Sequence, residues 1–172
     1  MTSNILFHSI FFLFPAVMAY AASTDLLTMT IPNRACLALA LGYFILALVV
    51  GLPFDVIAIN LSCGAAVLAA TFVLFAKGWI GGGDAKLAAA SALWLGWALI
   101  LNYGLIASVF GGVLTLVLIV GRRAPLPEWA ARLGWLARLH HPESGVPYGI
   151  ALAAAGLVMY PQTEIWRKAV GL

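Results

Sequence analysis

Residues 79–97 of the 172-residue chain read WIGGGDAKLAAASALWLGW. This stretch joins three glycines and an Asp-Ala-Lys segment to an apolar run of the kind that crosses a lipid bilayer. Along the whole chain, 64% of residues are hydrophobic and only 9% are charged, and the mean hydropathy is +1.06. These proportions exclude a water-soluble globular protein and indicate an integral membrane protein.

Apolar segments of nearly membrane-spanning length recur from one end of the chain to the other. A helix needs about 17 to 25 mostly apolar residues to cross the hydrocarbon layer. We therefore predict an all-α, polytopic membrane protein with one membrane-embedded domain over residues 1–172 and about six transmembrane helices. The predicted spans are residues 5–22, 35–51, 56–76, 85–101, 103–120 and 146–161. Only Asn102, Tyr103 and Gly104 separate the fourth span from the fifth, so five spans remain an alternative.

Residues 121–145 form the only sizeable loop, and they carry an amphipathic pattern. Trp129, Leu133, Leu136 and His140 recur at helical spacing and would line one stripe. A helix with such a stripe and basic residues beside it lies flat on a membrane surface. We predict an amphipathic cytoplasmic interfacial segment that serves as an anchored connector, with binding of anionic lipid or of an acidic partner as the alternative.

The distribution of Lys and Arg predicts the orientation, because these residues concentrate on the cytoplasmic side of membrane proteins. With six spans, one side receives seven of the nine basic residues, and the other side receives Arg167 and Lys168. The seven are Arg34, Lys77, Lys86, Arg122, Arg123, Arg132 and Arg138. Both termini should then lie outside, with the loops at 23–34, 77–86 and 121–145 in the cytoplasm.

Asp25 and Asp84 fall at this same cytoplasmic level. Either acid alone is explained as a helix cap, since Asp84 can accept hydrogen bonds from the first amides of the helix that follows it. A cap does not require Gly81, Gly82 and Gly83, each of which loses backbone freedom on folding. Glycines here would allow an extended peptide substrate to approach the chain closely.

Two carboxylates that approach closely can support acid–base chemistry. They cannot both ionise easily, so one holds a proton near neutral pH while the other stays charged. The charged member can take a proton from an attacking water, and the protonated member can hydrogen-bond the peptide carbonyl and supply the leaving amine. The sequence does not assign these two roles. Lys86 could favour the charged form of Asp84, but we expect it to reach the lipid headgroups instead.

Three segments resemble the type IV prepilin peptidases, which belong to the GxGD class of membrane aspartyl proteases. Residues 81–87, GGGDAKL, are similar to the GxGDxKL segment of that family. Asp25 with Ile31-Pro32-Asn33 is similar to its aspartate loop, and Pro147-Tyr148-Gly149 to the PYG that opens its last helix. The order of the three segments and the six-span layout also fit.

The resemblance implies that Asp25 and Asp84 form a catalytic pair and that a prepilin or pseudopilin is cut on the cytoplasmic side of the bacterial inner membrane. We expect no cofactor, no metal and no nucleic-acid partner. The chain lacks the cytoplasmic domain with CxxC motifs of the larger bifunctional members, so it resembles the short, peptidase-only form of tight-adherence (Flp) pili. Type II secretion pseudopilins and an archaeal preflagellin remain alternative substrates, and the oligomeric state stays open.

Seven further residues are expected to bind substrate or shape the site. They are Gly81, Gly82, Gly83, Lys86, Pro32, Asn33 and Tyr148. Tyr148 also has a plain interpretation as an interfacial aromatic, which we favour. Two rival functions remain, an ion- or proton-coupled transporter and a non-catalytic component of pilus assembly. Transport would favour acids near the bilayer midplane rather than beside loops.

Overall fold

The computed structural model describes residues 2–171, with side chains from residue 12 onward. All regular structure in these residues is helical, which confirms the predicted all-α class. The helices are α1 (Thr2–Thr28), α2 (Asn33–Val49), α3 (Phe54–Ala76), α4 (Gly82–Gly121), α5 (Glu128–Ala131), α6 (Gly134–His140), α7 (Tyr148–Met159), the 3-10 helix η1 (Tyr160–Gln162) and α8 (Glu164–Val170). The terminal residues 1 and 172, which the predicted domain includes, lie outside the described residues.

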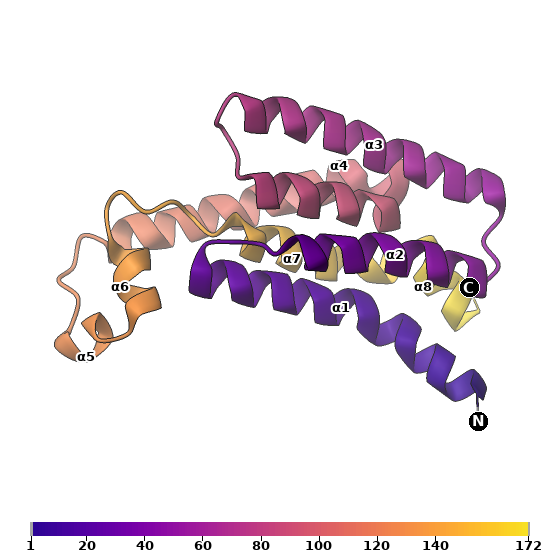
Figure 1. Cartoon of the computed structure of the whole chain (residues 1–172), viewed down its shortest axis with the longest axis horizontal. Coiled ribbons are helices and arrows are strands. Elements are labelled where there is room, and N and C mark those ends of the chain that lie inside the picture. The colour runs from indigo at the N-terminus through magenta and orange to yellow at the C-terminus, as the bar shows by residue number, and fades with distance from the viewer. Residues whose placement is uncertain (1, 172) are drawn as a thin grey trace.

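The long helices run side by side in an elongated bundle (Figure 1). α1 packs against α2, α3 packs against α4, and α7 packs against both α1 and α4. The beginning of α1 and the whole of α8 lie at one end of the bundle, whereas α5 and α6 project from the other. The end of α1, the start of α4 and the start of α7 therefore meet at the end that carries α5 and α6.

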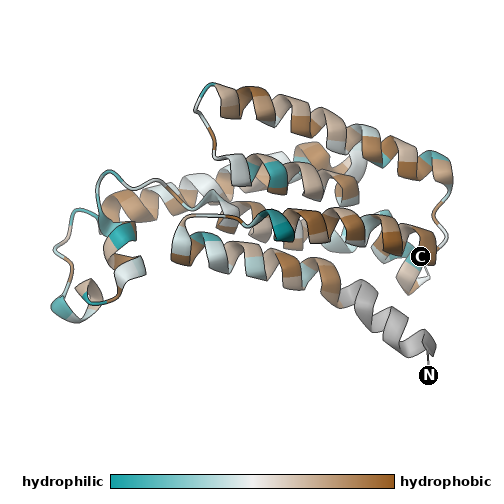
Figure 2. Ribbon diagram, viewed as in Figure 1, coloured by the Kyte–Doolittle hydropathy of each residue, from teal (hydrophilic) through white to brown (hydrophobic). Residues whose placement is uncertain are grey.

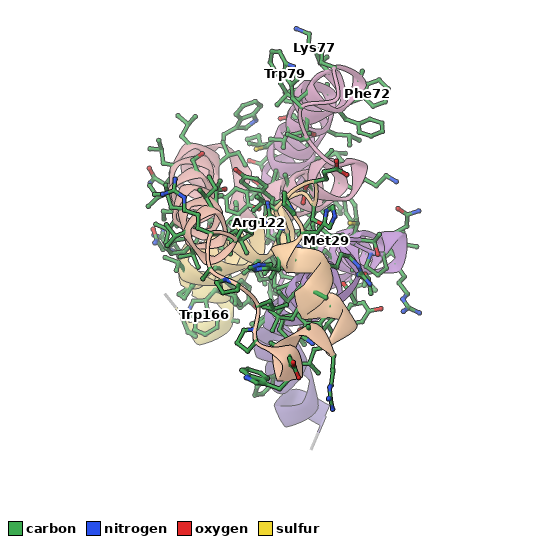
Figure 3. All side chains as sticks on the ribbon, turned by 90° about the vertical axis from the view of Figure 1, so that its left-hand side faces the viewer. Met29, Phe72, Lys77, Trp79, Arg122 and Trp166 are labelled. Atoms are coloured by element: carbon green, nitrogen blue, oxygen red, sulfur yellow. The ribbon has the colours of Figure 1, made fainter. Side chains whose placement is uncertain are left out.

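The surface of the bundle is suited to lipid. α3 and α4 are long and apolar enough to cross a membrane, and α2 and residues 12–28 of α1 are shorter apolar stretches. Figure 2 shows hydrophobic colour along these helices and hydrophilic colour around α5, α6 and the neighbouring loops. Large apolar side chains such as Phe72, labelled in Figure 3, Leu101 and Val113 point outward. Extensive apolar surface of this kind is unfavourable in water. The count of six crossings stays a prediction.

α4 is interrupted at Gly96, which has φ 62° and ψ −179°. This backbone conformation is essentially restricted to glycine. The chain reverses there, so that the second part of α4 runs back beside the first (Figure 1). The predicted boundary at residues 102–104 was wrong, because those residues lie within the helix after the turn. The reversal depends on a backbone geometry that only glycine provides, and not on local polarity.

Two other predicted features are corrected. α1 continues to Thr28, so Asp25 lies in its last turn rather than in a loop over residues 23–34. The interfacial segment is not one helix, since Leu133 has an extended backbone that separates α5 from α6. The predicted apolar stripe is therefore divided between two short helices. Arg122 holds this segment in place by donating hydrogen bonds to the carbonyls of Leu139 and Gly145, both at 2.9 Å.

We predict that Gly96→Ala destabilises the protein. The substitution imposes a left-handed φ on alanine, and the new methyl group would collide with the amide oxygen of Asn60. Strain of this kind costs about 1–3 kcal/mol. Thermal unfolding in detergent should show a lower midpoint. Gly104→Ala is the matched control, because nothing lies within 4 Å of a methyl group there. Equal midpoints for the two variants would contradict the role of Gly96.

Candidate active site

Asp25 is held by the start of α7. Its Oδ2 atom accepts a hydrogen bond from the backbone N–H of Gly149 at 2.7 Å, and the residue is only 5% exposed. The first amides of a helix have no partner within the helix, and they carry partial positive charge. A buried carboxylate is therefore placed where such an amide compensates for its lost hydration.

The position of Gly149 requires glycine. A methyl group there would lie 2.8 Å from Asp25 Oδ2 and 2.8 Å from Ile31 Cδ1. A distance below 3.0 Å would force one of these groups to move. The absence of a side chain thus lets α7 approach the acid closely enough to donate the hydrogen bond.

Asp84 lies in the first turn of α4, half-buried, and its carboxylate accepts a hydrogen bond from the Gly81 backbone N–H. Gly81 is the N-cap residue of α4. The capping explanation considered for Asp84 is therefore correct in part. The side chain reaches back to the cap residue, as in a capping box, instead of capping the amides that follow.

The two acids interact. Asp25 and Asp84 lie near enough to repel each other electrostatically, although they belong to different helices. Among the described side chains, no Lys or Arg forms an ion pair with either acid. Two neighbouring carboxylates without a compensating cation bind protons as a coupled pair. The end of the bundle thus holds two acids, each fixed by one backbone amide.

Lys86 bonds to a residue other than the two acids. Its Nζ atom donates a hydrogen bond to Asn33 Oδ1 at 2.8 Å, which links α4 to the first residue of α2. Lys86 remains exposed, so its expected extension toward lipid headgroups stays a prediction. Pro32 is the N-cap residue of α2, so it sets the start of the helix that presents Asn33.

The three glycines before Asp84 have different surroundings. A methyl group on Gly83 would lie 3.0 Å from Ile31 Cβ, and one on Gly82 would lie 3.2 Å from the Phe75 ring. Gly81 is exposed, and a methyl group on it would lie 2.8 Å from Asp84 Oδ2. The close approach that glycine allows is thus used within the chain at all three positions.

A family model for the type IV leader peptidase family matches residues 12–116. The chain belongs to this family. The matched range contains both aspartates and most of α4, and it ends before α7 begins. No curated protein and no solved structure matches the chain. The geometry above is therefore that of a leader peptidase family member in which Asp25 depends on a residue outside the matched range.

Tyr148 begins α7 and is 42% exposed. Its ring packs against Gly111 and its hydroxyl lies 3.3 Å from the hydroxyl of Thr115, both on α4. These contacts pack the start of α7 against α4. Sequence reasoning chose Tyr148 and missed its neighbour Gly149, although a glycine directly after a Pro-Tyr helix start is a signal of close backbone approach.

A metal site would need several ligands in one place. Among the described residues, no group of three His, Cys, Asp or Glu side chains could hold a metal ion. His141 accepts a hydrogen bond from the Glu143 backbone N–H at 3.3 Å, at the end of α6.

We predict that Gly149→Ala lowers proteolysis of a leader-bearing substrate by at least about tenfold, because displacement of a reacting group by 1 Å can have effects of that size. The added methyl group would push the Asp25 carboxylate from its amide donor. The measurement is the initial rate of cleavage in membranes, normalised to the amount of inserted protein. Gly145→Ala is the control, since its nearest neighbour would be Met29 Cε at an ordinary 3.6 Å. Equal rates in the two variants would show that the Gly149 contact does not matter.

Proposed function

We propose that this protein is a membrane aspartyl endopeptidase that removes the N-terminal leader of type IV-like prepilins, with Asp25 and Asp84 as its catalytic pair. The observation that carries the proposal is the electrostatic interaction of two acids from separate helices, unpaired with any described cation, in a member of a leader peptidase family. An isolated cap residue would not need a second acid beside it. The pairing therefore favours a reaction over a purely structural role.

In the proposed reaction, the two carboxyl groups catalyse the attack of one water molecule on one peptide bond. The charged carboxylate accepts a proton as the water oxygen bonds to the peptide carbonyl carbon. The protonated carboxyl donates a hydrogen bond to the carbonyl oxygen, and the C–N bond then breaks as a proton passes to the leaving amine. The amides of Gly149 and Gly81 hold the two carboxylates during these transfers. The proton count belongs to the pair, so neither acid is given a fixed role.

We propose that the site faces the cytoplasm in the bacterial inner membrane and that both termini lie outside. The support is the charge distribution. Arg34, Lys86 and the basic residues of segment 122–138 lie at the end of the bundle where the acids meet, while Arg167 and Lys168 lie in α8 at the other end. Lys and Arg mark the cytoplasmic side.

The sequence segments that resemble the family favour a type IV-like prepilin as the substrate, and we propose one of the tight-adherence (Flp) type or a related pseudopilin. A cut beside the membrane surface suits a substrate whose leader precedes a hydrophobic helix. The exposed Gly81 lies beside Asp84, where an extended segment could approach it.

We predict that Asp25→Asn and Asp84→Asn each abolish leader removal. The amide keeps the size of the side chain but can neither accept the proton from water nor act as an acid, so we expect at least about a thousandfold loss of rate. The assay is co-expression with candidate prepilins, followed by the mobility of the substrate on gels.

Asp55→Asn is the matched control, because Asp55 is an exposed acid in the first turn of α3 at the other end of the bundle. Cleavage by either active-site variant would remove that residue from the mechanism. Failure of the wild-type protein on every candidate prepilin would contradict the proposed function as a whole, and would direct attention to proton coupling.

We also predict that a reporter fused after Leu172, a residue outside the described part of the chain, is located outside the cytoplasm. Six crossings with both termini outside require this, whereas five crossings would place the two termini on opposite sides. Paired alkaline phosphatase and green fluorescent protein fusions distinguish the outcomes, since each is active on only one side. Fluorescence from the C-terminal fusion would contradict the proposed orientation.

A further inference from the structure

Tyr103 carries a buried hydroxyl group whose role the proposed reaction leaves open. The residue is 3% exposed, and its Oη atom has no hydrogen-bond partner among the described residues. Leaving a buried hydroxyl without a partner is unfavourable, because its lost hydration is not replaced. A phenylalanine would fill the same space without this cost. The hydroxyl therefore calls for an explanation.

The turn at Gly96 brings Tyr103 back beside the first part of α4. Its hydroxyl lies beside Ser91 and near enough to Asp84 to interact with it electrostatically. In a straight helix, residues 84 and 103 would be about 28 Å apart, at 1.5 Å per residue. Asp84 and Ser91 are seven positions apart, which places them on one face of the helix. Asp84 and Ser91 therefore lie on the side of α4 that faces Tyr103.

Ser91 is fully buried, and its hydroxyl donates a hydrogen bond to the Leu87 carbonyl at 2.8 Å. Its only proton is thus engaged, and its oxygen can still accept a hydrogen bond. The Tyr103 hydroxyl can donate. Around Tyr103 the packing is apolar, formed by Leu95, Ala107, Ala155 and Met159.

We propose that Tyr103 is a positioning residue for Asp84, and that with Ser91 it holds an ordered water which hydrogen-bonds toward the Asp84 carboxylate. Buried waters characteristically bridge two to four otherwise unsatisfied polar groups. The water gives the Tyr103 hydroxyl its partner, and it supplies Asp84 with a second donor beside the Gly81 amide. Tyr103 acts through the acid and does not touch the substrate.

The proposal rests on the proposed peptidase function for its kinetic consequence. The groups around Asp84 are Asp25 from α1, the Gly81 amide at the start of α4, and Tyr103 from its second part. Lys86 donates a hydrogen bond to Asn33, and the Gly149 amide of α7 donates one to Asp25. A donor directed at Asp84 stabilises its charged form. Without that donor, a higher pH is needed for the same fraction of Asp84 to be charged.

The experiment compares Tyr103→Phe with Tyr43→Phe, each of which removes a single oxygen atom. Tyr43 is a matched control because its Oη is also buried without a hydrogen-bond partner, and it lies beside Asn60 rather than near Asp84. For Tyr103→Phe we expect kcat to fall about 3- to 10-fold with KM unchanged, as loss of one hydrogen bond to the acid would produce. The acidic limb of the pH–rate profile should move to higher pH. Tyr43→Phe should show neither change.

A second measurement does not depend on activity. Difference infrared spectroscopy of the purified protein over a pH series reports the C=O stretch of a protonated carboxyl group, and Asp84→Asn identifies the band of Asp84. Tyr103→Phe should shift this band in frequency and in titration midpoint, and Ser91→Ala should shift it in the same direction. Tyr43→Phe should leave it unchanged.

The outcomes separate the two proposals. Normal kinetics and an unchanged Asp84 band in Tyr103→Phe would overturn the positioning role, whatever the function of the protein. A shifted band in a protein that cleaves no prepilin would keep the positioning role and reject the peptidase. Equal changes in Tyr103→Phe and Tyr43→Phe would indicate a general packing effect and would also overturn it.

Discussion

The structure depends on the need of a buried carboxylate for hydrogen-bond donors. At the edge of a membrane such donors are scarce, because almost every backbone amide is already used within a helix. The exceptions are the first amides of each helix. Asp25 and Asp84 each use one of them, from Gly149 and Gly81. The acids can meet only where helices begin, and this fixes the starts of α4 and α7 beside the end of α1.

The interior of the bundle holds these helix ends in register. Small residues line α7, including the buried Ala151, Ala153, Ala155 and Gly156. They allow the backbones of α1 and α4 to approach, as small residues do in membrane helix packing. Beside them, Phe14 stacks on Tyr160 at 4.8 Å between ring centroids, and Trp94 donates a hydrogen bond to the Leu39 carbonyl at 3.0 Å. Contacts deep in the bundle therefore set the geometry at its end.

Much of this arrangement was predictable from hydropathy and from the charges of the loops. The lengths of α2 and α3 follow from their apolar runs, and the common level of the two aspartates follows from the charge pattern of the loops. The turn at Gly96 was not predicted, because a positive φ leaves no mark on hydropathy and the more polar residues 102–104 looked like a better boundary. The bond between Lys86 and Asn33 and the contact between Gly149 and Asp25 join distant segments. No local sequence pattern predicts contacts between residues so far apart in the chain.

The two acids differ in how their supports are encoded. Asp84 is fixed by a residue three positions before it, so its orientation forms together with the first turn of α4. Asp25 is fixed by an amide 124 positions away, and its orientation exists only after α7 has docked between α1 and α4. Contacts between distant parts of a chain carry a larger entropic cost of closure and tend to form late. In a newly inserted chain, Asp84 would therefore be oriented first, and Asp25 only after α7 has packed. The pair would stay incomplete until the whole bundle has assembled.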